Sequence, residues 1–473
     1  MAGTILIDGE SGMPPAEIFY VAYGKDDADK AQRPITFVFN GGPGAASAYL
    51  HLGALGPRRL VFNDDGSVAP APARLVDNHM SWLAFTDLVF IDPVGTGYSR
   101  IEKKDKDEKE KGERDKGGDD KGGRPFWQVK KDLTSLSEFI RLYLSRNKRW
   151  PSPKFVAGES YGGFRAAALS QELTTDFGIG LNGIIMISPV LEFGLMQGDD
   201  YRVMPWVLLV PSYAAAAIDH GRSSLAGSGS EGMAKTLEQV EAFSLDSLLT
   251  TLAQGDAIDA TARKKVYEKL AGYIGLPLDV VERYHGRVPP WVFAKRVLGG
   301  QRLIGLYDAS ITAPDPDPDR PMVEGFDPTI DGITAPVTSA FNAYVRDELG
   351  FETDLRYELL NQEISRDWDW QSGDEQKQGY RGAADHLKAA MILNPSLKAL
   401  IAHGYFDLVT PYFTSLYVVN HMALDDAMRR NLTFKIYECG HMIYTHAQAR
   451  EQLYADVKTF YTSALPQQPA EGN

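Results

Sequence analysis

The chain has 473 residues, 44% of them hydrophobic and 11% aromatic, as expected of a globular protein with a sizeable core. Its 49 basic and 63 acidic residues leave a net charge of −14, which argues against a nucleic-acid-binding surface. The single cysteine, Cys439, excludes an intramolecular disulfide. No C-x-x-C or H-E-x-x-H spacing occurs, so we expect neither a metal nor another cofactor.

The sequence shows neither a leader nor a membrane span. The N-terminal stretch MAGTILIDGESG has no basic region followed by an apolar one. No apolar run approaches the ~20 residues of a membrane-spanning helix. We therefore expect no membrane association and, for the chain as given, a cytoplasmic location. An upstream signal missing from this sequence would instead make the protein periplasmic or secreted.

The first third of the chain alternates strand-like runs with turns. Aromatic and β-branched residues dominate 17–23, 34–42 and 87–97, and two of these runs end in glycine-rich loops. A helix is predicted over 127–145, where apolar residues recur every three or four positions.

Three further apolar runs, at 181–190, 397–404 and 431–438, are typical of strands buried on both faces. Interleaved with helices, they predict an α/β fold with one parallel-rich sheet covered on both faces.

The predicted domain organisation is a core formed by residues 1–191 and 391–473. The stretch 192–390 breaks the strand–helix rhythm and is helical, irregular and rich in proline near 313–321, so we interpret it as a cap inserted between two strands. Residues 103–124 carry almost only charged residues and glycine, with the two signs nearly balanced, which indicates a solvated surface loop.

The stretch GESYGG at 158–163 stands between a strand-like run and a helix-like run. This is the nucleophile-elbow pattern G-x-S-x-G, in which a tight turn pushes the Ser160 hydroxyl out of the sheet. Glycines on both sides let the strand and the helix approach each other without a Cβ clash. The alternative is a glycine-rich turn with an ordinary serine.

An elbow serine needs a base and a group that orients the base, and both candidates follow it in chain order. Asp407 comes just after one apolar strand and His441 just after the last, where catalytic groups gather in open α/β sheets. Taken singly, Asp407 suits a helix N-cap and His441 an ordinary loop. Their shared order and placement favour a Ser-His-Asp triad.

These motifs resemble the serine carboxypeptidase family, peptidase family S10, and most closely its bacterial, disulfide-poor members. The matching stretches are NGGPGAASAY at 40–49, GPRR at 56–59, DPVGTGYS at 92–99, GESYGG at 158–163, GYFDLVTPY at 404–412 and GHM at 440–442. The likeness runs from about residue 17 to the C-terminal helix. It implies an α/β-hydrolase fold with a helical cap.

The resemblance implies a role for each matching residue. Ser160 is the nucleophile, His441 the general base and then acid, and Asp407 the group that orients it, in an acyl-enzyme mechanism. The backbone N–H groups of Gly42 and Tyr161 form the oxyanion hole.

The resemblance also implies that Asn40 and Glu159 bind the free C-terminal carboxylate of a peptide. Acid-active members have a second glutamate where this chain has Ala54, which leaves Glu159 to act with Asn40 alone. Trp368 and Trp370 either line a pocket for an apolar side chain or simply contribute to the core.

The function that follows is that of a serine carboxypeptidase acting on peptide substrates. An acyltransferase or esterase using the same triad is the alternative, and a non-catalytic binding protein is a third. The sequence leaves open the side-chain preference and the oligomeric state.

Overall fold

The computed structural model describes residues 1–7, 14–102, 124–225, 232–320, 325–370 and 381–465. The predicted charged loop at 103–124 lies, up to residue 123, outside the described residues. Within these ranges, no helix is both long and apolar enough to cross a membrane.

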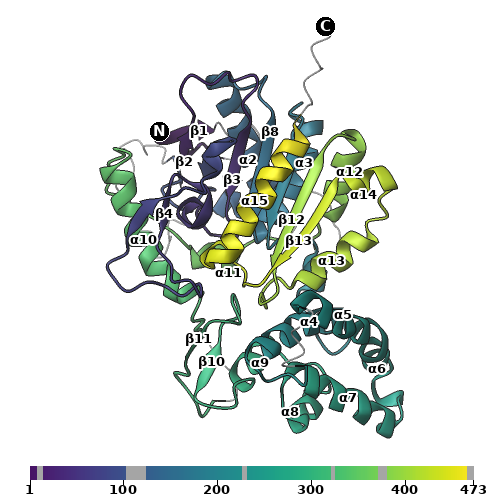
Figure 1. The fold of residues 1–473 in the computed structure, drawn as a ribbon. Helices are drawn as coiled ribbons and strands as arrows, with labels where there is room; N and C mark the ends of the chain where they lie inside the picture. The colour runs from purple at the N-terminus through teal and green to yellow at the C-terminus, as the bar shows by residue number, and fades with distance from the viewer. Residues whose placement is uncertain (8–13, 103–123, 226–231, 321–324, 371–380, 466–473) are drawn as a thin grey trace, which may run out of the picture.

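A large mixed sheet forms the centre of the structure (Figure 1). Its strands are β1 (Ala2–Ile7), β2 (Ala16–Tyr23), β3 (Ile35–Phe39), β6 (Asp87–Ile91), β7 (Arg100–Ile101), β8 (Lys154–Glu159), β9 (Gly183–Ile187), β12 (Lys398–Gly404) and β13 (Leu432–Tyr437). Their order across the sheet is β1-β2-β6-β3-β8-β9-β12-β13, with β7 beside β2. From β6 to β13 all neighbouring pairs are parallel, whereas the β1–β2 and β2–β6 pairs are antiparallel.

Helices cover both faces of this sheet, and the strands alternate between two apolar clusters. One face is covered by α2 (Val129–Arg146), α3 (Tyr161–Thr175) and α12 (Ala384–Leu393), and the other by α10 (Ile330–Asp347) and α15 (Ala447–Ala464). In β3, Phe37 and Phe39 belong to the first cluster and Val38 to the second. The predicted α/β-hydrolase fold is confirmed by this arrangement.

Short elements connect these layers. They are α1 (Ala48–Leu50), a π-helical turn (His51–Leu55), β4 (Arg58–Leu60), β5 (Leu75–Asp77), α11 (Gln362–Asp367), α13 (Tyr412–His421) and α14 (Asp426–Arg430).

A separate group of helices lies beyond the end of the sheet (Figure 1). It contains α4 (Met204–Asp219), α5 (Met233–Phe243), α6 (Leu249–Gln254), α7 (Ala260–Ile274), α8 (Leu278–Arg283) and α9 (Pro290–Arg296), followed by the hairpin of β10 (Arg302–Ile304) and β11 (Thr312–Pro314). These helices share a third apolar cluster, which also includes Phe406 and Leu408 from the loop after β12 and Tyr412 at the start of α13. The domain boundaries at 191/192 and 390/391 remain a prediction.

The register of the parallel strands brings several loops to one edge of the sheet. Phe39 at the end of β3 pairs with Gly158, and Glu159 at the end of β8 pairs with Ile187. The end of β12, Gly404, likewise pairs with Tyr437 of β13. The loops that follow these strands therefore meet, although they are far apart in sequence.

Candidate active site

Ser160 has the backbone conformation expected of a nucleophile elbow. It stands between the last residue of β8 and the first of α3, with φ 61° and ψ −124°, a region that few non-glycine residues adopt. Its N–H donates to the Ile187 carbonyl at 2.9 Å, which anchors the turn. A Cβ on Gly158 would lie 1.9 Å from the carbonyl oxygen of Gly162, so only glycine fits there.

The loop after β3 lies directly against this turn. A Cβ on Gly41 would come within 2.5 Å of the Tyr161 nitrogen and 2.7 Å of the Glu159 carbonyl oxygen. Among the described residues, neither the N–H of Gly42 nor that of Tyr161 donates to a protein acceptor. Tyr161 is also the first residue of α3, where the helix dipole favours negative charge. These two N–H groups, predicted to form the oxyanion hole, thus have no acceptor among the described residues.

His441 and Asp407 are joined by a buried hydrogen bond. The Nδ1 atom of His441 lies 2.7 Å from Asp407 Oδ2, and the Asp407 Oδ1 atom accepts from the backbone N–H groups of Val409 and Thr410 at 2.9 and 2.8 Å. Because a carboxylate can only accept, the His441 proton lies on Nδ1, which leaves Nε2 as the acceptor for a serine proton.

Burial of His441 disfavours its charged form, but the Asp407 carboxylate more than offsets this. The net effect is a raised pKa of His441.

Hydrogen bonds to its backbone from two distant parts of the chain hold His441 in place. Its N–H donates to the carbonyl of Tyr307 at 2.6 Å, and its own carbonyl accepts from the Ser188 hydroxyl at 2.8 Å. The Tyr307 ring meets the imidazole edge to face, with centroids 5.3 Å apart.

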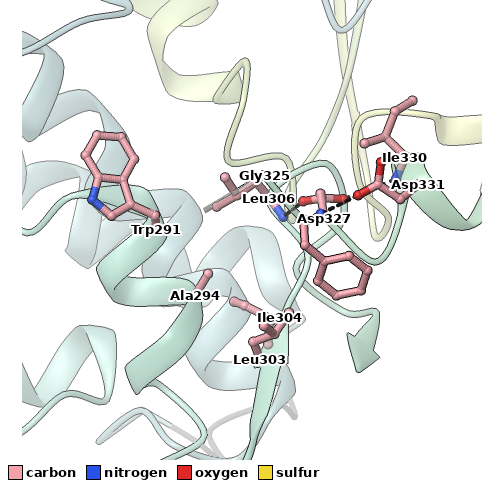
Figure 2. Close-up of a pocket in the computed structure, with 10 residues that line it drawn as sticks. Trp291, Ala294, Leu303, Ile304, Leu306, Gly325, Asp327, Ile330 and Asp331 are labelled. Carbon is pink, nitrogen blue, oxygen red and sulfur yellow. Dashed lines mark hydrogen bonds between the residues drawn. The ribbon is translucent and has the colours of Figure 1, made fainter. Parts of the chain in front are cut away.

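Tyr307 follows Leu306, which lines a pocket beside the hairpin of β10 and β11 (Figure 2). Asp327 lies next to Leu306, and its Oδ2 atom accepts from the Leu306 N–H at 2.5 Å. The N–H of Asp327 in turn donates to Asp331 Oδ2 at 2.8 Å. The cavity has a volume of about 290 Å³ and is lined mainly by apolar side chains, among them Trp291.

Thr410 is a site residue that the sequence reasoning missed. Its hydroxyl lies 2.5 Å from Asp407 Oδ2, 3.0 Å from His441 Nδ1 and 3.0 Å from the Ser188 carbonyl oxygen. It thus contacts both partners of the His–Asp pair. The only sequence signal was its place three residues after Asp407, where an Asx-type turn is common.

Glu159 and Asn40, the two residues predicted to bind a substrate carboxylate, are in direct contact. The Asn40 side-chain amide donates to Glu159 Oε2 at 2.5 Å, and Asn40 Oδ1 accepts from the Leu50 N–H at 3.1 Å. Burial raises the pKa of Glu159 to about 7, although the nearby His441 and the donors on its oxygens favour the charged form.

Glu159 has a further partner that the sequence analysis did not identify. The Tyr444 hydroxyl donates to Glu159, at 3.0 Å from Oε2 and 3.3 Å from Oε1. Ala54 is buried in the π-helical turn, and its carbonyl accepts from the Asn78 side chain at 2.6 Å.

His51, the nearest histidine to Ala54 in sequence, is fully buried away from this pair. It stacks on Phe90 with centroids 4.0 Å apart and bonds the Tyr23 hydroxyl at 2.8 Å. Burial lowers the pKa of His51 to about 3.

A buried ion pair fixes the position of the Asn40 loop. Arg165 of α3 bonds Asp132 of α2 at 2.7 Å, and its other arm donates to the Asn40 carbonyl at 2.7 Å. Its guanidinium also lies over the Tyr161 ring, 4.8 Å from the centroid. Sequence reasoning did not identify Arg165, because nothing in a helical pattern distinguishes a buried arginine from an exposed one.

The sequence analysis also named Cys439, Trp368 and Trp370. Cys439 is fully buried, and burial raises the pKa of its thiol, in keeping with a small apolar residue. The rings of Trp368 and Trp370 both contact Tyr161, at 5.5 and 5.9 Å between centroids. Trp368 is buried, whereas Trp370 is 39% exposed. In the described parts of the chain, no three His, Cys, Asp or Glu side chains converge to hold a metal ion.

The N-terminal part of the chain is similar in sequence to known proteins. Residues 11–193 match the profile of the serine carboxypeptidase family, Peptidase_S10. Serine carboxypeptidase-like 5 of Arabidopsis thaliana is 26% identical over 197 residues, which cover 40% of this chain and 39% of the relative. The pheromone-processing carboxypeptidase KEX1 of Cryptococcus gattii serotype B is 37% identical over 93 residues, 20% of this chain and 13% of that protein. The chain thus spans about two fifths of the length of the plant relatives it matches.

The fold is similar over a greater length. The crystal structure of a prohormone-processing carboxypeptidase from Saccharomyces cerevisiae superposes with a TM-score of 0.57. The superposition covers 98% of this chain and 90% of that chain, at 16% sequence identity. At this identity the likeness concerns the fold alone.

Proposed function

We propose that this chain, which carries serine carboxypeptidase-family sequence over residues 11–193, is a serine-type carboxypeptidase that hydrolyses the C-terminal residue of peptides. The observation that carries the proposal is the buried Asn40–Glu159 pair next to Ser160. Glu159 is the residue before Ser160, so a group that can read a carboxylate adjoins the group that can attack the last peptide bond. A general esterase has no need of such a pair.

In the proposed reaction, Ser160 Oγ attacks the carbonyl carbon of the last peptide bond, and His441 Nε2 takes its proton. Asp407 stabilises the imidazolium that forms. The oxyanion of the tetrahedral intermediate accepts hydrogen bonds from the N–H groups of Gly42 and Tyr161, each typically worth about 3–4 kcal/mol of barrier.

The intermediate then collapses, and the C–N bond breaks as His441 gives its proton to the leaving amine. The C-terminal amino acid departs and an acyl ester remains on Ser160. A water molecule, deprotonated by His441, hydrolyses this ester and restores the enzyme.

Recognition of the substrate carboxylate depends on the proton of Glu159. Two carboxylates repel each other at hydrogen-bond distance, so Glu159 must be protonated to donate to the substrate. Because burial already raises the pKa of Glu159 to about 7, protonation costs little under mildly acidic conditions. The Leu50 N–H holds the Asn40 amide in the orientation that directs its donor toward this site.

We also propose that, within this family, the chain is most similar to the bacterial, disulfide-poor members. This proposal is supported by the single, buried Cys439. The relatives named above are plant and fungal proteins.

The test is incubation with a mixed peptide library, with products read by mass spectrometry and Ser160→Ala as the control. We expect loss of single residues from free C-termini, and a much slower reaction of C-terminally amidated peptides. Internal cleavage, or no cleavage of peptides alongside rapid hydrolysis of simple esters, would contradict the proposal. Added alcohol acceptors reveal an acyltransferase if acyl products exceed hydrolysis.

A further inference from the structure

The Tyr444 side chain lies beside Glu159, although the position of Tyr444 in the sequence does not predict this contact. It lies in the 3-10 turn Ile443–Thr445, three residues after His441, and is buried. Its hydroxyl donates to Glu159 Oε2 at 3.0 Å, with a longer contact of 3.3 Å to Oε1. Within the described residues, the Asn40 amide is the other donor to this carboxyl group.

The ring of Tyr444 fits a space left by two small residues. A Cβ on Gly53 would lie 2.3 Å from Cε2 and 2.4 Å from Cδ2 of the ring, so any larger residue at position 53 would displace it. The next residue is Ala54, at the position where a second glutamate is expected. The Arg450 guanidinium donates to the Tyr444 carbonyl at 2.9 Å and fixes the backbone of the turn. The position of the hydroxyl is therefore set by the fold.

We propose that Tyr444 is a positioning residue for the substrate carboxylate, whose hydroxyl replaces a second acid beside Glu159 and sets the pH range in which free-acid peptides bind. The inference rests on the proposed function, since it concerns the same Glu159. It also has a consequence that can be measured without any substrate.

Of Tyr444 and Glu159, only Glu159 can take up a proton. Burial, together with the neighbouring Glu159 charge, raises the pKa of Tyr444 well above its usual value, so the hydroxyl stays protonated and donates. A second carboxyl group would share a proton with Glu159, but a tyrosine hydroxyl cannot take one up. Glu159 itself must therefore carry the proton that meets the substrate carboxylate.

Other ionisable groups also act on Glu159. His441 favours its charged form, and Asp407 disfavours it. Tyr49 and Tyr307 also lie within electrostatic reach of Glu159, and the pKa values of both are raised chiefly by burial. Of these groups, Tyr444 donates directly to the carboxyl group, and its bond favours the charged form of Glu159.

Removing the Tyr444 hydroxyl should therefore raise the pKa of Glu159 further above its present value of about 7.

The substrate-free test is an infrared titration of the protonated carboxyl band that Glu159→Gln removes. We expect Tyr444→Phe to move the midpoint upward by about one pH unit, the usual effect of one hydrogen bond to a charged group. The matched control is Tyr437→Phe, which loses a tyrosine–carboxylate bond of 2.9 Å to Asp456 elsewhere in the fold. The control should leave the midpoint unchanged, and an unchanged midpoint in Tyr444→Phe would overturn the inference.

The kinetic test compares an N-blocked dipeptide with its C-terminal amide across pH. In Tyr444→Phe the alkaline fall of kcat/KM for the free acid should shift upward by about one pH unit. The preference for the acid over the amide at low pH should drop roughly three- to tenfold as Glu159 loses a positioning contact, while rates on the amide should change less than threefold. If Tyr444→Phe unfolds at a clearly lower temperature than wild type, Tyr444→Met is used instead, because its flexible side chain can fill the space of the ring. We expect the same results for this variant.

The two proposals fail in different ways. If wild type shows an acid preference that Glu159→Gln abolishes and Tyr444→Phe leaves intact, the inference about Tyr444 is wrong and the carboxypeptidase proposal stands. If the infrared midpoint shifts as expected but no peptide is cleaved, the proposed function fails and the control of Glu159 by Tyr444 stands.

Discussion

His441 Nδ1 lies 2.7 Å from Asp407 Oδ2, and both side chains are buried. The two residues come from different loops, one after β12 and one after β13, so the contact exists because these parallel strands end side by side. This hydrogen bond is important for stability because both side chains are buried, and an unpaired buried charge at either position would cost free energy.

The first prediction concerns the triad. Ser160→Ala and His441→Ala should each lower kcat by about three or more decades, and Asp407→Asn somewhat less. A fluorophosphonate probe should label wild type and fail to label Ser160→Ala. If His441→Ala kept a tenth of wild-type kcat, another histidine would be the base. The structure makes this unexpected for His446, whose Nε2 is bonded to Asp308 at 2.7 Å.

Thr410 gives a prediction that separates positioning from mere stability. Thr410→Val should lower kcat about tenfold, because the hydroxyl that contacts both Asp407 and His441 is lost. Asp407 would then hold the imidazolium more strongly, so the pKa of His441 should rise further and the acid limb of the kcat profile should shift to higher pH. Thr410→Ser should restore both rate and profile. A loss of rate without a shift of the acid limb would show that Thr410 has only a structural role.

The pH dependence of free-acid peptide hydrolysis should be a narrow bell. His441 must be neutral, and its pKa is raised above 6.5, so kcat/KM should increase as pH rises through that pKa. Glu159 must be protonated, so binding should weaken as pH rises through about 7. An amidated substrate needs only the first condition and should show no alkaline fall from Glu159. Identical alkaline limbs for the acid and the amide would mean that Glu159 does not read the carboxylate.

The ion pair between Arg165 and Asp132 should be important for folding. Arg165→Met leaves Asp132 as an uncompensated buried charge and frees the Asn40 carbonyl, so we expect a loss of about 3–5 kcal/mol in the free energy of unfolding. Denaturant titration measures this. The double variant Arg165→Met/Asp132→Leu should lose less than the sum of the single variants, because no charge remains unpaired. Additive losses would show that the pair does not act as a unit.

His446 should make stability depend on pH. Burial lowers its pKa, but the Asp308 carboxylate outweighs this, so the pKa of His446 is raised. A raised folded-state pKa contributes stability that is fully present below the unfolded value of about 6.5 and is lost as pH rises through the folded value. The difference in Tm between wild type and His446→Gln should therefore be larger at pH 5.5 than at pH 8.5. An equal difference at both pH values would contradict the role of the charged pair.

The amino-acid sequence by itself was enough to predict the parallel strands, the tight turn at Ser160 and the chain order of the three triad candidates. Apolar runs such as 397–404 are long and uniform enough to specify buried strands, and the glycines around Ser160 specify a tight turn through local sterics. The rule that functional groups follow the ends of parallel strands then brought Asp407 and His441 together.

Tertiary structure alone decided which polar groups meet around these residues. Tyr444 and Glu159 are 285 positions apart, and Arg165 reaches a carbonyl 125 positions away. Hydrophobic periodicity encodes which face of an element is buried, but a hydrogen bond depends on the direction and separation of two particular atoms. Those are set only when the strands, the turn after His441 and α3 are packed together, so the partners of Glu159 could not be read from the chain.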